Sequence, residues 1–118
     1  MNRRILAIVA VLVILAALFF VFRPKSSAPA AQARTFTMTV KNGSVTPDTL
    51  TAYEGDTITF HVTADHDMEL HLHGYDRALE LKKNKPGSET FHANLTGSFT
   101  MEDEEAHNEL ATLNVQPR

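Results

Sequence analysis

The hydrophobic positions of the chain follow one pattern up to residue 22 and a different one after residue 34. Residues 5–22 form an unbroken apolar run, and a helix of this length spans roughly 27 Å at about 1.5 Å per residue. That length is close to the ~30 Å hydrocarbon thickness of a bilayer. Arg3 and Arg4 precede the run, and Arg23, Pro24 and Lys25 follow it. The pattern predicts one transmembrane helix.

A cleaved signal peptide is the alternative interpretation of the same run. Its apolar region is usually about 7–15 residues long and is followed closely by a small-x-small cleavage site. Here the nearest such site is Ala31-Gln32-Ala33, well past the run. We therefore expect an uncleaved signal anchor over residues 1–23, although basic residues at both ends leave its orientation open. The small and Pro-containing residues 24–34 predict a flexible linker.

From residue 35 onward, apolar and polar residues alternate with the period of a β-strand. Asn42-Gly43, Glu54-Gly55-Asp56 and the segment 85–88 are turn signals between the alternating segments. The alternation predicts strands at 35–40, 50–53, 57–62, 89–93, 98–101 and 110–115, with a further strand around 69–73. Short strands at this spacing are typical of an antiparallel β-sandwich. Residues 35–118 are enough for one such domain with a single modest core.

Charge and cysteine content narrow the function further. All 14 acidic residues lie beyond residue 34 together with six of the 11 basic residues, so residues 35–118 carry a net charge of −8. A surface of this sign repels nucleic acid and attracts cations. The chain has no cysteine, which excludes disulfides, thiolate zinc sites and thiol catalysis. No nucleophile motif, P-loop or dinucleotide-binding glycine pattern is found, so we do not expect an enzyme.

The segment ELHLHGYD, residues 69–76, holds the strongest candidate chemistry. Residues i and i+2 of a strand share one face, with Cα atoms about 6.5–7 Å apart, so the imidazoles of His71 and His73 can converge on one ion. The competing interpretation is an ordinary polar face, because Leu70 and Leu72 alternate with the histidines. The period of two does not decide between these interpretations, because a strand near the rim of a sandwich can twist or bulge.

Two longer segments resemble a known family. VTPDTLTAYEGDTITFHV (45–62) is similar to the first half of a cupredoxin-like domain, and PGSETFHANLTGSFTME (86–102) is similar to its closing half. With ELHLHGYD and the ending ATLNV, the resemblance covers roughly residues 35–116. It implies a Greek-key β-sandwich over 35–118 of the kind found in membrane-anchored or periplasmic bacterial proteins, many of which handle metals.

The resemblance also implies where a metal would bind. In blue copper members a mid-chain His is followed by a Cys, a His and often a Met in the last loop. These positions fall near His71, on Asp103, on His107 and near Leu110, so the thiolate and the thioether are both missing. A blue-copper electron carrier needs the Cu–thiolate bond and is therefore not expected. The remaining candidate ligands are His71, His73, His107, Asp103 and Met68, with Glu104 and Glu105 in the same predicted loop.

The sequence thus predicts a single-span protein of a bacterial inner membrane whose cupredoxin-like domain faces the periplasm or the exterior. It would bind copper, or another divalent metal, for handling or delivery to a membrane protein partner. Imidazole with carboxylate suits Cu(II) or Zn(II), whereas imidazole with Met68 would suit Cu(I). The alternative is a metal-free adaptor that keeps the fold and docks to a membrane partner complex.

Overall fold

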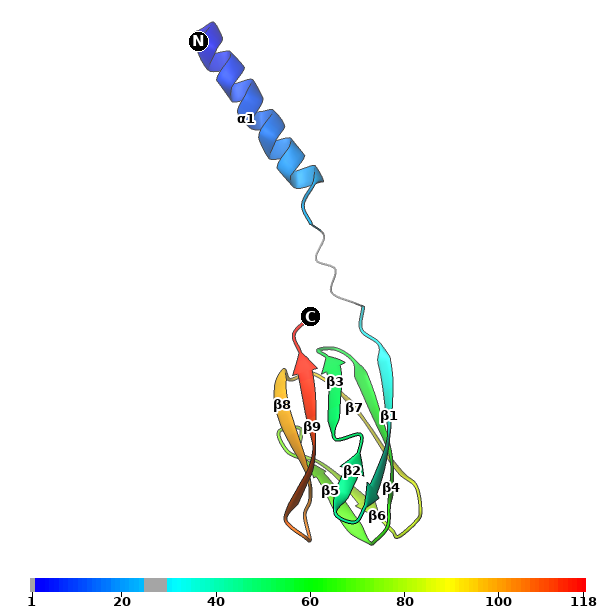
Figure 1. Ribbon diagram of the computed structural model, residues 1–118. Helices are drawn as coiled ribbons and strands as arrows, with labels where there is room; N and C mark the ends of the chain where they lie inside the picture. The colour runs from blue at the N-terminus through cyan, green and yellow to red at the C-terminus, as the bar shows by residue number, and fades with distance from the viewer. Residues whose placement is uncertain (1, 25–29) are drawn as a thin grey trace.

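The structure is a computed structural model that describes residues 2–24 and 30–118. One helix is followed by a domain built from β-strands in two layers (Figure 1). The elements are α1 (Arg3–Val21), β1 (Ala33–Lys41), β2 (Ser44–Thr46), β3 (Thr49–Tyr53), β4 (Thr57–Ala64), β5 (Met68–Leu72), β6 (Arg77–Leu81), β7 (Gly87–His92), β8 (Gly97–Asp103) and β9 (Asn108–Gln116).

The strands form two sheets that pack face to face. One sheet has four strands in the order β2-β1-β4-β7, and the other has five in the order β3-β9-β8-β5-β6. The expected β-sandwich is therefore confirmed, and every predicted strand is present. The short strands β2 and β6 were not predicted. The chain at Arg77–Leu81 has only Leu79 and Leu81 as large apolar residues, too weak an alternation to predict a strand.

The prediction of a wholly antiparallel sandwich is wrong for two pairs of strands. β1 pairs with β4 in parallel over residues 33–40, and β3 pairs with β9 in parallel over residues 49–53. The other strand pairs in the described part of the chain are antiparallel. Alternation of apolar and polar residues is the same in both kinds of ladder, so the sequence pattern gives the faces of a strand but not its direction.

The core lies between the two sheets and is made by the inward residues of each alternating strand. In β4 the side chains of Ile58, Phe60 and Val62 are buried. In β5 the buried side chains are those of Met68, Leu70 and Leu72. Burying one such side chain contributes roughly 1.5–3 kcal/mol. Burial of these leucines decides the direction of their neighbours, because His71 must then point out of the sandwich.

Helix α1 is apolar around its whole circumference. Its mean hydropathy is 3.0, and it is the one helix in residues 2–24 and 30–118 that is long and apolar enough to cross a membrane. A signal sequence passes the same test of length and composition. The predicted linker 24–34 lies partly outside the described residues, and β1 begins at Ala33, inside its predicted range.

Asp56 joins both ends of the β-domain. Its side chain is 0% exposed, accepts hydrogen bonds from the backbone amides of Gln32 and Tyr53, and forms ion pairs with Arg34 and Arg118. Burial alone would raise the pKa of this carboxyl, but the amide and arginine contacts prevail and lower it to about 2. The turn Glu54-Gly55-Asp56 predicted from the sequence is therefore also a junction between distant segments.

Candidate metal centre

The two histidines of ELHLHGYD project from the outer face of the five-stranded sheet. His71 lies in β5, and His73 is the first residue after β5, where its backbone amide still donates to the carbonyl of Thr100 at 2.9 Å. This hydrogen bond continues the ladder for one more residue and keeps both histidines on the same face. The side chain of His71 is 18% exposed and that of His73 is 45% exposed.

Two carboxylates reach the same face from the neighbouring strand β8. The antiparallel register places Glu102 directly opposite His71, and the inward residue Asp103 opposite Leu70. Glu104 follows β8, and its amide donates to the carbonyl of Glu69 at 3.0 Å. A β-bulge against β9 occurs between Met101 and Glu102, and bulges commonly re-aim the adjacent side chains.

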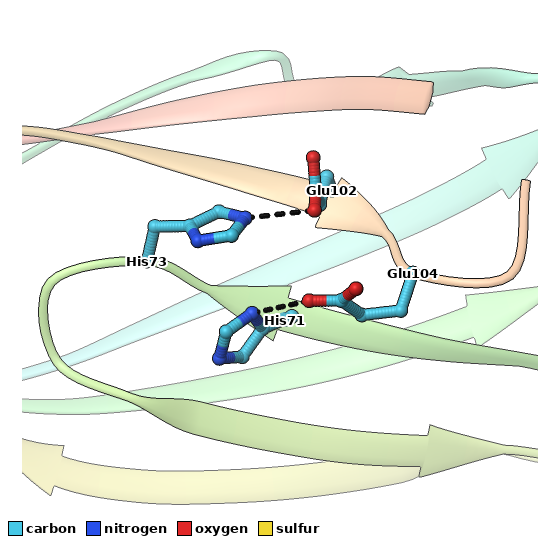
Figure 2. Close-up of side chains that lie close together, drawn as sticks. All are labelled: His71, His73, Glu102 and Glu104. Carbon is cyan, nitrogen blue, oxygen red and sulfur yellow. Dashed lines mark ion pairs between the residues drawn. The ribbon is translucent and has the colours of Figure 1, made fainter. Parts of the chain in front are cut away.

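The four side chains converge diagonally across the two strands (Figure 2). Nε2 of His73 lies 2.9 Å from Oε1 of Glu102, and Nδ1 of His71 lies 2.5 Å from Oε1 of Glu104. The two imidazole rings are 4.5 Å apart between centroids. One ligand atom from each of the four residues lies within 4.8 Å of the others. We name this set, His71, His73, Glu102 and Glu104, the His/Glu cluster.

Burial and the neighbouring carboxylates shift the pKa of His71 in opposite directions. Burial lowers the pKa of its imidazole, but Asp76 and Glu104 raise it, and the net direction is upward from the ordinary value of 6.5. A cation at this position is thus favoured electrostatically.

One nitrogen of the cluster is buried without a hydrogen bond. Nδ1 of His71 is the buried side-chain nitrogen that has no hydrogen-bond partner among the described residues. It is close to Glu104, but the directions of the two groups do not meet the requirements of a hydrogen bond. Buried polar atoms normally have a partner, and for this nitrogen the partner is the carboxylate of Glu104, which lies 2.5 Å away as an ion pair.

The sequence of the chain matches one known protein family. The profile of the cupredoxin-like domain family matches residues 11–114, which is most of the chain. The chain belongs to the cupredoxin-like domain family. No curated protein matches its sequence significantly.

Solved structures support the same fold for this cupredoxin-like domain. A copper binding protein solved by NMR in the apo form is 10% identical with a TM-score of 0.60, over 71% of this chain and 88% of that one. Auracyanin A, a "blue" copper protein from Chloroflexus aurantiacus, is 12% identical with a TM-score of 0.56, over 71% and 99%. A laccase from Botrytis aclada is 14% identical with a TM-score of 0.63, over 75% of this chain and 23% of the laccase. The present chain thus spans about a quarter of the laccase, and identities this low show the fold alone.

The cupredoxin-like fold places the other predicted ligands outside the cluster. Met68 is fully buried in the core, on the opposite face of β5 from His71. His107 is exposed in the turn between β8 and β9, and it is not part of the group that could hold a metal. Neither residue is brought to His71 and His73 by the strand register, so their proposed role as ligands gains no support from the geometry.

Asp103, which stands where blue copper members have Cys, turns inward and is 3% exposed. Its Oδ2 lies 2.9 Å from Nε2 of His66, while its Oδ1 accepts from the amides of Glu105 and Ala106. The carboxylate therefore fixes the turn that follows Glu104. The pKa of Asp103 is lowered, because the contact with His66 and the two amides outweigh its burial.

Glu102 was not singled out from the sequence, because the run 102–105 is acidic throughout and Asp103 was preferred from the family resemblance. Acidic residues occupy both odd and even positions of this run, so either face of the strand could carry a carboxylate. Only the register of β5 against β8 shows that Glu102 and Glu104 are the outward pair. The sequence does contain one signal for this pair, because Glu102 and Glu104 are two positions apart, as are His71 and His73.

The donor set fits some metals and not others. Metal–nitrogen and metal–oxygen bonds of about 2.0–2.2 Å place tetrahedral ligands roughly 3.4 Å apart, so the His/Glu cluster, with its atoms within 4.8 Å, needs only small side-chain adjustments. Two imidazoles and two carboxylates suit Cu(II) or Zn(II). A blue-copper centre does not fit, because the chain has no cysteine to supply the thiolate.

Proposed function

We propose that this cupredoxin-like protein binds a divalent metal ion through the His/Glu cluster and stores it or delivers it to a membrane partner. The observation that carries this proposal is the convergence of His71, His73, Glu102 and Glu104 within 4.8 Å. Their backbone positions are held by the ladder between β5 and β8, so the fold itself brings the four donors together. A preorganised set of donors lowers the cost of assembling a site.

Cu(II) is the metal that this donor set favours. At a site of nitrogen and oxygen donors, affinity for divalent first-row metals peaks at Cu(II) and is lower for Zn(II). Cu(I) prefers the soft ligands of Met and Cys, and the core position of Met68 keeps its thioether away from the cluster. We therefore expect Cu(II) to bind more tightly than Zn(II), and Cu(I) to bind weakly.

Binding, rather than catalysis or electron transfer, is the role that the cluster supports. The fast electron transfer of blue copper proteins depends on a thiolate ligand, which this chain cannot supply. The net charge of −8 over residues 35–118 raises the local concentration of cations near the domain. Capture and release of a cation needs no further chemistry.

The proposed location is a bacterial inner membrane, with α1 as an uncleaved anchor and the domain on the periplasmic or exterior side. The length and apolar composition of α1 support the membrane anchor. The basic residues at both ends of the apolar run leave its orientation open, so the side on which the domain lies is part of the proposal. Alkaline extraction should leave the protein in the membrane pellet, and its release into the wash would contradict the anchor.

The test is a titration of the full-length chain in detergent micelles with Cu(II), with Zn(II), and with Cu(I) under reductant. The variant His71→Ala/His73→Ala removes both imidazoles of the cluster, and His61→Ala/His92→Ala removes two exposed imidazoles from the other sheet as a matched control. We expect one equivalent of Cu(II) to bind with submicromolar affinity in the wild type and in the control, and to be lost in the cluster variant.

Equal binding by the wild type and both variants would reject the His/Glu cluster as the site. Absence of binding to the wild type would favour the metal-free adaptor that docks to a membrane partner complex. Tighter binding of Cu(I) than of Cu(II) would reject the nitrogen and oxygen donor set.

A further inference from the structure

Glu104 reaches His71 from the start of a turn. It is the first residue after β8, and Figure 2 shows its carboxylate turned toward His71, with Oε1 2.5 Å from Nδ1. Its amide still donates to the carbonyl of Glu69 in β5 at 3.0 Å, which holds the N-terminal side of the residue. The C-terminal side belongs to the turn, so the turn has to complete the placement of its side chain.

The side chain of Asp103 closes this turn around Glu104. Oδ1 of Asp103 accepts hydrogen bonds from the amides of Glu105 at 3.1 Å and Ala106 at 3.2 Å. An Asp side chain bonded to the amide two residues later forms an Asx-turn, and the residue inside that ring is Glu104. The backbone angles of Glu104, and with them the direction of its Cα–Cβ bond, are therefore restrained by the orientation of the Asp103 carboxylate.

His66 contacts the other oxygen of that carboxylate. Nε2 of His66 lies 2.9 Å from Oδ2 of Asp103, and Nδ1 lies 2.7 Å from Oδ1 of Asp65. Oδ2 of Asp65 in turn accepts from the amide of Asn42 at 2.9 Å. An imidazolium donates from both ring nitrogens, and the contacts with Asp103 and Asp65 raise the pKa of His66. The ring is thus held between two carboxylates that are themselves bonded to backbone amides.

This contact lies on the inward side of β8, whereas the His/Glu cluster lies on its outer face. Asp103 is 3% exposed and stands opposite the buried Leu70. A change at His66 can therefore reach the cluster only through the carboxylate of Asp103 and the turn that it closes.

We propose that His66 is a positioning residue of the His/Glu cluster, which holds Asp103 so that the Asx-turn directs Glu104 toward His71. This inference rests on the metal site proposed above. Loss of a partner that orients a metal ligand typically costs about 10–100-fold in affinity. We therefore expect His66→Ala to lower the affinity for Cu(II) and Zn(II) by a factor in this range.

A double-mutant cycle separates positioning from general stability. Metal affinities are measured at one fixed pH on the full-length chain in detergent micelles, by competition with a chelator, for His66→Ala, Glu104→Gln and the double variant. If His66 acts through Glu104, the double variant should lose no more affinity than the weaker-binding single variant. The same cycle with Glu102→Gln should give losses that multiply, because Glu102 lies in the ladder of β8 before the Asx-turn.

Two further variants show which property of His66 matters. His66→Gln places a carboxamide nitrogen the same number of bonds from Cβ as Nε2, so it can still donate to Asp103 and should keep the affinity within a few-fold. His61→Ala removes an exposed imidazole from β4 on the other sheet and should leave the affinity unchanged. The electron paramagnetic resonance spectrum of Cu(II) in His66→Ala should match that in Glu104→Gln, because both lose the same ligand.

The outcomes separate this inference from the proposed function. Binding by the wild type, together with losses that multiply in the His66→Ala/Glu104→Gln variant, would overturn the role of His66 and leave the metal site standing. Unchanged or tighter binding by folded His66→Ala would also overturn it. If His66→Ala does not fold, the cycle is run with His66→Phe, which keeps a ring and removes both nitrogens. A wild type that binds neither metal would overturn the proposed function and this inference with it.

Discussion

The outer faces of the two sheets carry histidines at equivalent kinds of position but in different surroundings. On the four-stranded sheet, His61 lies opposite Ser88 and His92 lies opposite Thr57, and Nδ1 of His92 is 3.1 Å from the hydroxyl of Thr57. Apart from Ala33 and Lys41 at the two ends of β1, the remaining outward residues of β1, β4 and β7 are hydroxyl residues, namely Thr35, Thr37, Thr39, Thr57, Thr59, Thr63, Ser88 and Thr90.

On the five-stranded sheet several of the outward neighbours are acidic. His71 lies opposite Glu102, and the outer face of β5, β6, β8 and β9 also carries Glu69, Glu80 and Glu109. If the His/Glu cluster binds a metal as proposed, the cross-strand neighbours of an outward imidazole decide whether it can act as a ligand. Neither its own exposure nor its place in the alternation decides this.

Neutralising Glu102 and Glu104 should abolish tight metal binding by the outer face of the five-stranded sheet, so that this face resembles the outer face of the four-stranded sheet. The variant Glu102→Gln/Glu104→Gln keeps both imidazoles and the shape of the cluster but removes two anionic donors. We expect Cu(II) affinity to fall by at least the roughly 10–100-fold that loss of an outer partner costs, as measured by competition with a chelator. Glu69→Gln/Glu80→Gln, on the same face, is the matched control, and an equal loss in both variants would show that only bulk charge matters.

Placing two histidines and two glutamates at the corresponding positions of β4 and β7 should create a metal site on the outer face of the four-stranded sheet. In the antiparallel pair β4 and β7, His61 is opposite Ser88 and Thr59 is opposite Thr90. The triple variant Thr63→His/Ser88→Glu/Thr90→Glu therefore repeats the geometry of the His/Glu cluster on the other sheet. We expect calorimetry to detect a second, weaker equivalent of Cu(II).

The matched control for the transplant is Thr63→His/Ser88→Gln/Thr90→Gln, which should bind one equivalent only. If the folded triple variant also binds only one, the arrangement of donors across two strands is insufficient for binding, and the bulge beside Glu102 becomes the missing element.

The smallest expected effect is the dependence of stability on pH. The pKa of His71 is raised in the folded state, so its contribution to stability is full below about pH 6.5 and is lost as pH rises through the raised pKa. The metal-free protein should therefore have a lower free energy of unfolding at about pH 8 than at about pH 6. The pKa of His66 is raised by Asp103 and Asp65 and acts in the same direction.

The variant His71→Ala/His73→Ala should reduce this slope, whereas His61→Ala/His92→Ala should not. Zn(II) should reverse the slope, because only neutral imidazoles bind metal. Urea unfolding with and without Zn(II) measures both slopes, and a slope in the metal-free protein that is the same in all three proteins would contradict the role given to His71.

Much of the fold follows from local patterns in the sequence. The alternation in residues 57–62 correctly gives the buried face of β4, and the apolar run gives α1. The spacing of His71 and His73 places both on one face, whereas the outward direction of that face was left open by the sequence and is shown by the burial of Leu70 and Leu72 in the structure. These features depend only on neighbours along the chain.

The sequence-based predictions that failed concern features that depend on pairing between distant segments. The parallel direction of β1 against β4 and the register of β5 against β8 are set by how the whole sandwich closes. The resemblance to blue copper proteins pointed to Asp103, because that position holds Cys in the family, yet the structure turns Asp103 inward to His66. The outward position next to it, Glu102, could be chosen only once the register was known.

The junction at Asp56 has a mechanical consequence. Any tension carried along the chain from α1 enters the β-domain at Gln32 and Arg34, which are both bound to the carboxylate of Asp56. β1 then continues beside β4 through eight paired residues in parallel, so a pull on its N-terminal end loads those hydrogen bonds together in shear rather than peeling them one at a time. The tethered end of the domain is thus a rigid attachment point, and a pull on it reaches β4 of the hydroxyl-lined sheet before it can reach the ladder between β5 and β8.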